Sequence, residues 1–360
     1  MNSLDETVSE AGRLYSLGRF RESVDAYSLA ASMGCGAEVF FNRSLAYIQV
    51  KEYDNALSDI DRYCLLAGDD CQGHYLRGLV LDYKGDYQSA LNEYLRALSA
   101  DQYMIKAVRQ TVSLTLAVKK TPDKQESIPE HGVMIDARGE LIRLRELTCQ
   151  DNILSQTLED SIFSGGFWDF CLAPAMIKDD IRQVLLIGVA AGTIARQYVH
   201  FTGCAVDAVD PSIEIMSVCE KYFGKMPDEV VGHKMCGVEY MLGCDKKYDV
   251  IVFDAFVGEH VADELKSPAA LRTSKKILSD DGFLVWNTLV DGGVAEVEFV
   301  KNLLCDAFAN VYSACLDTNR VFIASDNLPN EKLTMSLSDP TDERLTELGK
   351  YILPRVKLEK

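Results

Sequence analysis

The chain has 360 residues, of which 48% are hydrophobic, and its formal net charge is −18. This length allows two or three domains with cores of their own, and the acidic balance without a basic patch disfavours nucleic acid as a partner. The eleven cysteines include no Cys-x-x-Cys pair, which argues against a zinc site and against a disulfide framework. No apolar run is long enough to cross a bilayer, so we expect no membrane association and a cytoplasmic protein, with the nucleus not excluded.

Residues 4–101 contain an internal repeat of 33–34 residues. The triplets Gly18-Arg-Phe20, Lys51-Glu-Tyr53 and Gly85-Asp-Tyr87 hold the same place in three successive units, and a small residue follows each at a fixed distance. Small residues allow two helices to cross closely, and the pattern is typical of tetratricopeptide repeats. We therefore expect residues 1–120 to form an α-helical solenoid of three repeats with a capping helix.

Stacked repeats of this kind present a concave surface, and we expect it to bind a protein or peptide. The second repeat resembles chaperone-cofactor repeats at Asn42, but the first repeat has Val8 and Gly12 where such a clamp needs Lys and Asn. The sequence thus favours generic protein binding over recognition of a chaperone tail. The candidate contact residues are Asn42, Tyr47 and Tyr75.

Residues 121–132 are polar and contain two prolines, which predicts a linker. Two alternating runs then flank Asp136–Gly139, and this pattern predicts a β-hairpin. The hairpin opens a second domain over residues 133–327, followed by a C-terminal tail with a helix over 328–360.

Strand and helix patterns alternate in this second domain. The apolar run 184–187 is followed by a glycine-containing turn and a helical stretch, and the run 205–209 is followed by Asp210. A third run, 248–253, leads directly to Asp254. Such an order predicts an open, Rossmann-like α/β sheet whose ligands lie at the carboxyl ends of the strands. Asp210 has a simpler alternative role as the N-cap of the next helix.

The segments V-L-L-I-G-V-A-A-G, A-V-D-P-S, K-Y-D-V-I-V-F-D-A-F, L-S-D-D-G-F-L-V-W-N-T and N-R-V-F-I-A resemble the spermidine-synthase-like branch of the S-adenosylmethionine-dependent methyltransferases. The resemblance covers about residues 131–326 and implies an α/β methyltransferase domain that binds S-adenosylmethionine. No metal is implied. The residues that the resemblance places at the cofactor are Gly188, Ala190, Gly192, Asp210, Cys236, Gly237 and Asp254.

The chain departs from this family at several acidic positions. Ala191 and Val257 replace two acids of the aminopropyltransferases, so the sequence disfavours polyamine synthesis. Ala208 and Cys236 replace acids that hold the ribose and the adenine, and two lost hydrogen bonds would cost about 2–5 kcal/mol of cofactor affinity.

The polar candidates for catalysis are Asp254 and His260. Asp254 has an alternative role as an acceptor of backbone N–H groups in its own loop, and a lone surface histidine is the commoner outcome for His260. Two functions remain open: a methyltransferase whose repeats recruit a protein substrate, or an inactive scaffold that keeps the fold.

Overall fold

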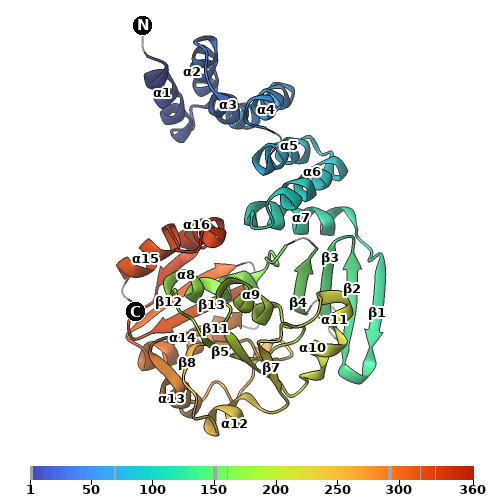
Figure 1. The fold of residues 1–360 in the computed structure, drawn as a ribbon, viewed down its shortest axis with the longest axis vertical. Coiled ribbons are helices and arrows are strands. Elements are labelled where there is room, and N and C mark those ends of the chain that lie inside the picture. Colours follow the sequence, from blue (N-terminus) through green and yellow to red (C-terminus); the bar gives the residue numbers. More distant parts are fainter. Residues whose placement is uncertain are drawn as a thin grey trace. The chain divides into compact units, whose positions relative to one another are not determined.

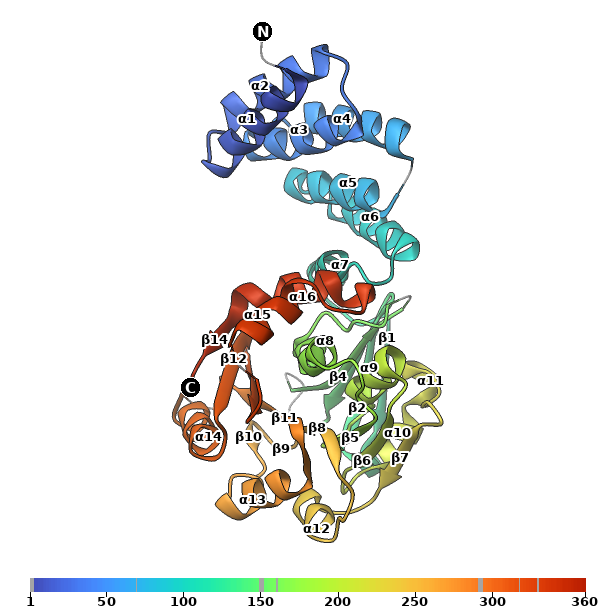
Figure 2. The same ribbon diagram turned by 60° about the vertical axis from the view of Figure 1, so that its left-hand side comes forward.

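The computed structural model describes residues 3–68, 70–148, 152–159, 161–290, 294–316, 318–328 and 330–360. The chain divides into two compact units, Met1–Val118 and Lys119–Lys360. Figures 1 and 2 show the helices and strands of both units.

The first unit consists of helices that pack in consecutive pairs, α1 with α2, α3 with α4 and α5 with α6, and a further helix packs on α6 (Figure 1). This is the predicted repeat architecture. The bounds are α1 Leu4–Ser16, α2 Phe20–Ser32, α3 Ala37–Gln49, α4 Tyr53–Ala67, α5 Cys71–Lys84, α6 Tyr87–Ala100 and α7 Ile105–Val118.

The repeated triplets form the turn inside each helix pair. Gly18, Lys51 and Gly85 have φ angles of 74°, 62° and 80°, a left-handed conformation that ends one helix and redirects the chain into the next. The small residues that follow the triplets are fully buried: Ser23, Ala56 and Ala90 are each 0% exposed. The period read from the sequence therefore marks both the turns and the helix crossings.

A buried ion pair joins α3 to α4. Arg43 donates from Nε and Nη2 to the two carboxylate oxygens of Asp59, both at 2.7 Å, and both side chains are buried. Arg43 Nη1 also donates to Ser28 Oγ on α2 at 3.1 Å. A guanidinium with this many bonds fixes the packing of three neighbouring helices.

The second unit begins with an antiparallel sheet in the order β1-β2-β3-β4. The predicted hairpin is present, and its two-residue turn lies at 139–140, because Arg138 pairs with Leu141. The expected linker at 121–132 instead contains β1 and the short helix η1. Only the last residue of β1 is buried, so this edge strand has the polar composition that is typical of a linker. The bounds are β1 Lys124–Ile128, η1 Pro129–His131, β2 Val133–Arg138, β3 Leu141–Glu146 and β4 Ile153–Leu158.

The main sheet has the order β14-β12-β13-β11-β8-β5-β6-β7. From β11 to β7 neighbouring strands are parallel, and β13, β12 and β14 are added antiparallel. A separate two-stranded ribbon, β9 with β10, follows β8. The bounds are β5 Gln183–Ile187, β6 Ala205–Val209, β7 Val230–His233, β8 Tyr248–Phe253, β9 Phe256–Val257, β10 His260–Val261, β11 Leu278–Leu289, β12 Asn310–Leu316, β13 Asn319–Ser325 and β14 Val356–Leu358.

Helices cover both faces of the main sheet (Figure 2). One face packs on α12, α13 and α14 around the fully buried Trp286. The other face carries η2, α8, α9, α15 and α16. The bounds are η2 Phe167–Leu172, α8 Ala173–Ile177, α9 Thr193–Thr202, α10 Glu214–Val218, α11 Glu220–Phe223, α12 Gly237–Leu242, α13 Pro268–Ile277, α14 Val294–Ala307, α15 Asn330–Ser338, η3 Glu343–Leu345, α16 Thr346–Ile352 and η4 Leu353–Arg355.

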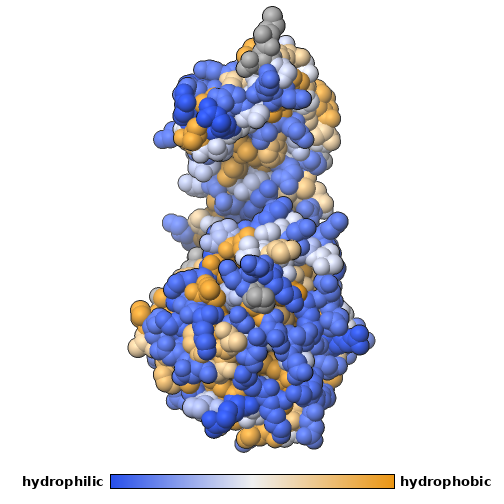
Figure 3. Space-filling view, turned by 90° about the vertical axis from the view of Figure 1, so that its left-hand side faces the viewer, coloured by the Kyte–Doolittle hydropathy of each residue, from blue (hydrophilic) through white to orange (hydrophobic). Residues whose placement is uncertain are grey.

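The segment 328–360, expected as a tail with one helix, takes part in the domain. It supplies α15 and α16 to one face and β14 to the edge of the main sheet. Hydrophilic residues predominate on the face of the molecule in Figure 3, with apolar residues scattered between them. No helix in the described part of the chain combines the length and apolarity that a membrane span needs.

Candidate functional site

The glycine-containing turn links β5 to α9 and has an unusual backbone. Gly188, Ala190 and Gly192 have φ angles of 84°, 48° and 82°, and side chains with a Cβ rarely adopt this region. A Cβ at Gly188 would lie 2.3 Å from the carbonyl oxygen of Asp254. Only glycine therefore allows the turn to touch the backbone that follows β8.

Asp210 connects the same turn to the end of β6. Its Oδ2 accepts the Val189 N–H at 2.9 Å, and its Oδ1 accepts the Ser212 N–H at 2.7 Å. The N-cap role considered from the sequence is wrong, because α10 begins later and Ile213 is its N-cap residue. Asp210 instead fixes the shape of the glycine turn.

The first sheet covers the glycine turn from β4. Ser155 Oγ, which is buried, accepts the Ala191 N–H at 3.1 Å. Ala191 packs with Ile135 and Leu144 of the first sheet and with α10 and α11. On the other side, a Cβ at Gly192 would lie 2.3 Å from Cε of Met226. The turn is thus enclosed by protein on these sides.

Asp254 lies at the carboxyl end of β8, where β11 and β13 bring two asparagines toward it. Asn287 donates from Nδ2 to Asp254 Oδ1 at 2.8 Å, and Asn319 donates from Nδ2 to Asn287 Oδ1 at 3.0 Å. Both asparagines are buried. The carboxylate is therefore held by a side-chain relay, and the alternative of backbone N–H donors in its own loop does not describe this contact.

The surroundings of Asp254 raise the pKa of its carboxyl toward neutral pH. Burial raises the pKa of its carboxyl to about 7, the hydrogen bond from Asn287 opposes this rise, and the charge of Asp210 adds to it. A carboxyl with such a pKa can accept or release a proton near neutral pH. Among the predicted residues, Gly188, Asp210 and Asp254 are brought together at this edge of the sheet.

Cys236 and Gly237 lie at the start of α12, where Cys236 is the N-cap residue. A Cβ at Gly237 would lie 2.3 Å from Cγ2 of Ile187, the last residue of β5. Gly237 therefore brings α12 close to the strand that leads into the glycine turn.

His260 lies on β10 with its side chain 63% exposed, and its Nδ1 is 3.6 Å from Oε2 of Glu296. Glu296 is also paired with Lys266 at 2.8 Å. His260 thus lies at the surface beside Glu296, in accord with the simpler interpretation of this residue.

The predicted partner-binding residues lie on the first helices of the second and third repeats. Arg43 lies over the ring of Tyr47 at 5.7 Å, and Lys106 lies over the ring of Tyr75 at 4.7 Å. Asn42 is partly exposed on α3. Both tyrosines also pack against the cores of their repeats, and partner binding at these residues stays a prediction.

Asp207 on β6 points to the face of α12, as the alternation of the strand predicts. It is buried and accepts hydrogen bonds from His233 at 2.8 Å, Lys246 at 2.7 Å and Tyr248 at 2.8 Å. Burial alone would raise the pKa of Asp207, but these three donors hold it below its usual value. Asp207 therefore joins β6, β7 and β8.

Sequence reasoning missed Ser155, Met226 and Asn319 at this site. The one available signal was the polar Asn319 close before the apolar run 321–324. In the described ranges, no group of three or more His, Cys, Asp or Glu residues is arranged to hold a metal ion.

The chain consists of helical repeats followed by an α/β domain with a mixed sheet, which is consistent with a methyltransferase-like fold. Comparison with known proteins gives relatives for each unit, although no family model matches the chain. A polyamine aminopropyltransferase of Methanocaldococcus jannaschii is 30% identical over 136 residues, which are 36% of this chain and 46% of that protein. The chain spans less than half the length of the curated aminopropyltransferases that it matches.

The repeats also have a relative. The human tetratricopeptide repeat protein 28 is 25% identical over 127 residues, which cover 35% of this chain and 5% of that protein. Among solved structures, the spermidine synthase of Thermotoga maritima matches with a TM-score of 0.46 at 13% identity, covering 62% of this chain and 77% of that chain.

Proposed function

We propose that the unit Lys119–Lys360 binds S-adenosylmethionine and transfers its methyl group to a protein that the repeats recruit. The observation that supports this most is the protonable carboxyl of Asp254, held at the carboxyl end of β8 against the glycine turn. This edge of an α/β sheet is where ligands bind. The proposed site consists of the turn 188–192 with Asp254 beside it.

Methyl transfer from a sulfonium needs a positioned nucleophile and a group that takes its proton. The cofactor supplies the activated methyl group. Asp254 is proposed to accept the proton of the acceptor atom. Asn287 donates to Oδ1 of Asp254, and we propose that Oδ2 of Asp254 faces the ligand. Cofactor affinity is expected to be weak, in the micromolar range or worse, because the side chain of Ala208 has no polar atom that could bind the ribose.

Titration calorimetry of the full chain with S-adenosylmethionine tests the proposal. We expect a measurable heat below millimolar cofactor, and an Asp254→Asn variant that still binds the cofactor but, at saturating cofactor, transfers labelled methyl groups 10²–10⁴-fold more slowly. The matched control is Asp263→Asn, because that carboxylate is 93% exposed and paired with Lys266, three residues further along the chain. Absence of heat at millimolar cofactor would overturn the proposal.

A second function, an inactive scaffold, is favoured because backbone N–H groups of the glycine turn are hydrogen-bonded to other residues of the same chain. The N–H groups of Val189 and Ala191 are already bonded to Asp210 and Ser155, and Met226 packs on Gly192. The test is to compare the wild type with an Ala208→Glu variant. If only the variant bound S-adenosylmethionine, the site would lack only the acidic residue that holds the ribose. The scaffold function would then be supported and the methyltransferase function rejected.

A further inference from the structure

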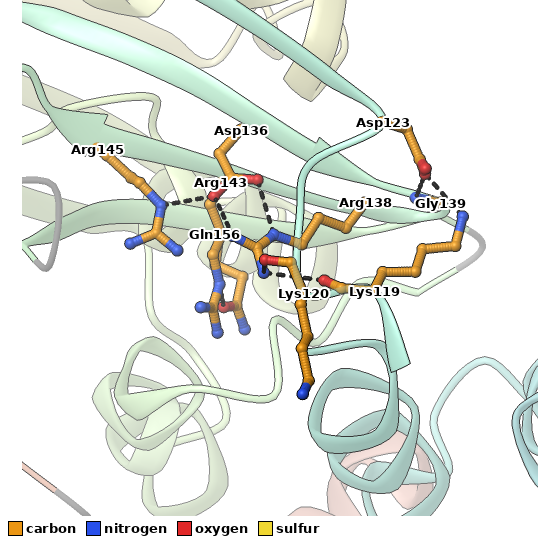
Figure 4. A network of polar contacts seen from close by, with 9 residues as sticks. All are labelled: Lys119, Lys120, Asp123, Asp136, Arg138, Gly139, Arg143, Arg145 and Gln156. Atoms are coloured by element: carbon orange, nitrogen blue, oxygen red, sulfur yellow. Dashed lines mark hydrogen bonds and ion pairs between the residues drawn. The ribbon is translucent and has the colours of Figure 1, made fainter. Parts of the chain in front are cut away.

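Three arginines share one face of the four-stranded sheet β1–β4. Asp136, Arg143 and Gln156 lie in one row across β2, β3 and β4. Arg138 and Arg145 lie two residues further along β2 and β3, so the alternation of the strands puts them on the same face. Figure 4 shows these side chains together.

One carboxylate serves two of these guanidinium groups. Asp136, which is 2% exposed, accepts Nε and Nη2 of Arg138 at 3.0 and 3.1 Å and Nε of Arg145 at 2.8 Å. Arg138 Nη1 also donates to the carbonyl oxygens of Lys119 and Lys120 (Figure 4). The carboxylate of Asp136 therefore pairs with Arg138 and Arg145.

Arg143 has a different environment. Its Nε donates to Gln156 Oε1 at 2.6 Å, and Gln156 donates from Nε2 to the Ser164 carbonyl at 2.6 Å. This second bond fixes the amide with its oxygen toward Arg143. Within the part of the chain that the structure describes, Arg143 forms no ion pair, and its hydrogen bond to Gln156 uses Nε alone. The buried polar atoms that lack a partner do not include its two terminal nitrogens.

The surroundings of Arg143 disfavour its positive charge. Burial lowers the pKa of its guanidinium to about 10, and the charge of Arg145 lowers it further. Among these four side chains the guanidinium groups outnumber the carboxylate, which gives the cluster an excess of positive charge. Residues 119–360 carry 26 basic and 39 acidic side chains, a net charge of −13, so this excess is opposite in sign to the rest of its unit.

We propose that Arg143, supported by Arg138 and Arg145, binds a phosphate group on this face of the first sheet. The terminal nitrogens of a guanidinium form a fork that matches two oxygens of a phosphate. A phosphate group also brings negative charge to a cluster in which guanidinium groups outnumber carboxylates. The site is separate from the glycine turn, since Ser155 and Leu144, which face that turn, alternate with Gln156 and Arg143 along their strands.

The test uses the full chain and measures the melting temperature and the binding heat with sodium phosphate at low millimolar concentration, against sodium chloride of equal ionic strength. We expect phosphate to raise the melting temperature of the wild type. Arg143→Gln should weaken phosphate binding at least tenfold, and Arg143→Lys, which keeps the charge but loses the fork, should also weaken it. Arg272→Gln is the matched control, because Arg272 is an exposed arginine of α13.

Arg143→Gln should itself fold, because it removes a charge that its neighbours repel. A wild type that responds to phosphate and chloride alike would overturn the proposal, as would an Arg143→Gln variant that responds as strongly as the wild type. Sodium acetate that stabilises the wild type as well as phosphate does would overturn the assignment to phosphate.

The source of the phosphate group is distinguished by comparing inorganic phosphate with a phosphoserine peptide. A peptide that binds at least tenfold more tightly, and loses this in Arg143→Gln, supports a phosphorylated protein ligand. Equal affinities that both fall in Arg143→Gln support free phosphate.

Discussion

Replacing Asp254 by asparagine tests the electrostatics of the candidate site through the stability of the second unit. The pKa of this carboxyl rises from 3.8 to about 7 on folding because burial disfavours the charge. Between these values the unfolded chain releases the proton and the folded chain keeps it, so the free energy of unfolding falls as the pH rises through this window. A shift of about 3 units at 1.36 kcal/mol per unit gives a loss of about 4 kcal/mol between pH 4 and pH 7.5.

The Asp254→Asn variant lacks this titration. The introduced amide can still accept the hydrogen bond from Asn287, so the two proteins should differ little at pH 4 and by about 4 kcal/mol at pH 7.5, with the variant the more stable. Urea unfolding followed by tryptophan fluorescence measures the second unit selectively, because both tryptophans of the chain, Trp168 and Trp286, belong to it. Asp263→Asn serves as the control. Parallel pH profiles for wild type and Asp254→Asn would show that the carboxyl is not buried in this way.

Three further predictions concern individual contacts. Lys51→Gly should stabilise the repeats by about 0.5–1 kcal/mol, because Lys51 has a φ of 62° that glycine adopts without strain; thermal melting followed by circular dichroism measures this, and an unchanged or lower melting temperature would contradict it. Arg43→Ala should cost about 3–5 kcal/mol by leaving Asp59 as an uncompensated buried charge, and a loss below about 1 kcal/mol in the same melting assay would show that the pair is not desolvated. Asn319→Ala should cost about 1–3 kcal/mol in urea unfolding, since it leaves the buried oxygen of Asn287 without its donor, and a neutral result would contradict the relay.

The sequence predicted those features whose physical cause is local. The repeats were visible because each turn needs a left-handed residue and each helix crossing needs a small one, so Gly18 and Ser23 recur at fixed spacing. The strands before Gly188 and Asp254 were visible as short apolar runs. β1 was not visible, because an edge strand can expose polar side chains on most of its length.

The contacts at the candidate site depend on residues far apart in the chain, and local pattern could not reveal them. The relay from Asn319 to Asp254 requires β13 to pair with β11, and the bond from the Ala191 N–H to Ser155 requires the first sheet to fold against the glycine turn. Asp210 resembled a helix cap from its neighbours alone, but the nearby turn offered it the N–H of Val189.

The hydrogen bond between Ser155 and Ala191 has a consequence for how the second unit can be divided. A fragment that begins after β4 would lose the side-chain acceptor of the Ala191 N–H and would uncover the apolar side chains that Ile135 and Leu144 now shield. The four-stranded sheet therefore covers one side of the glycine turn and supports its backbone. Shortened versions of this protein need to keep it if they are to retain the shape of that turn.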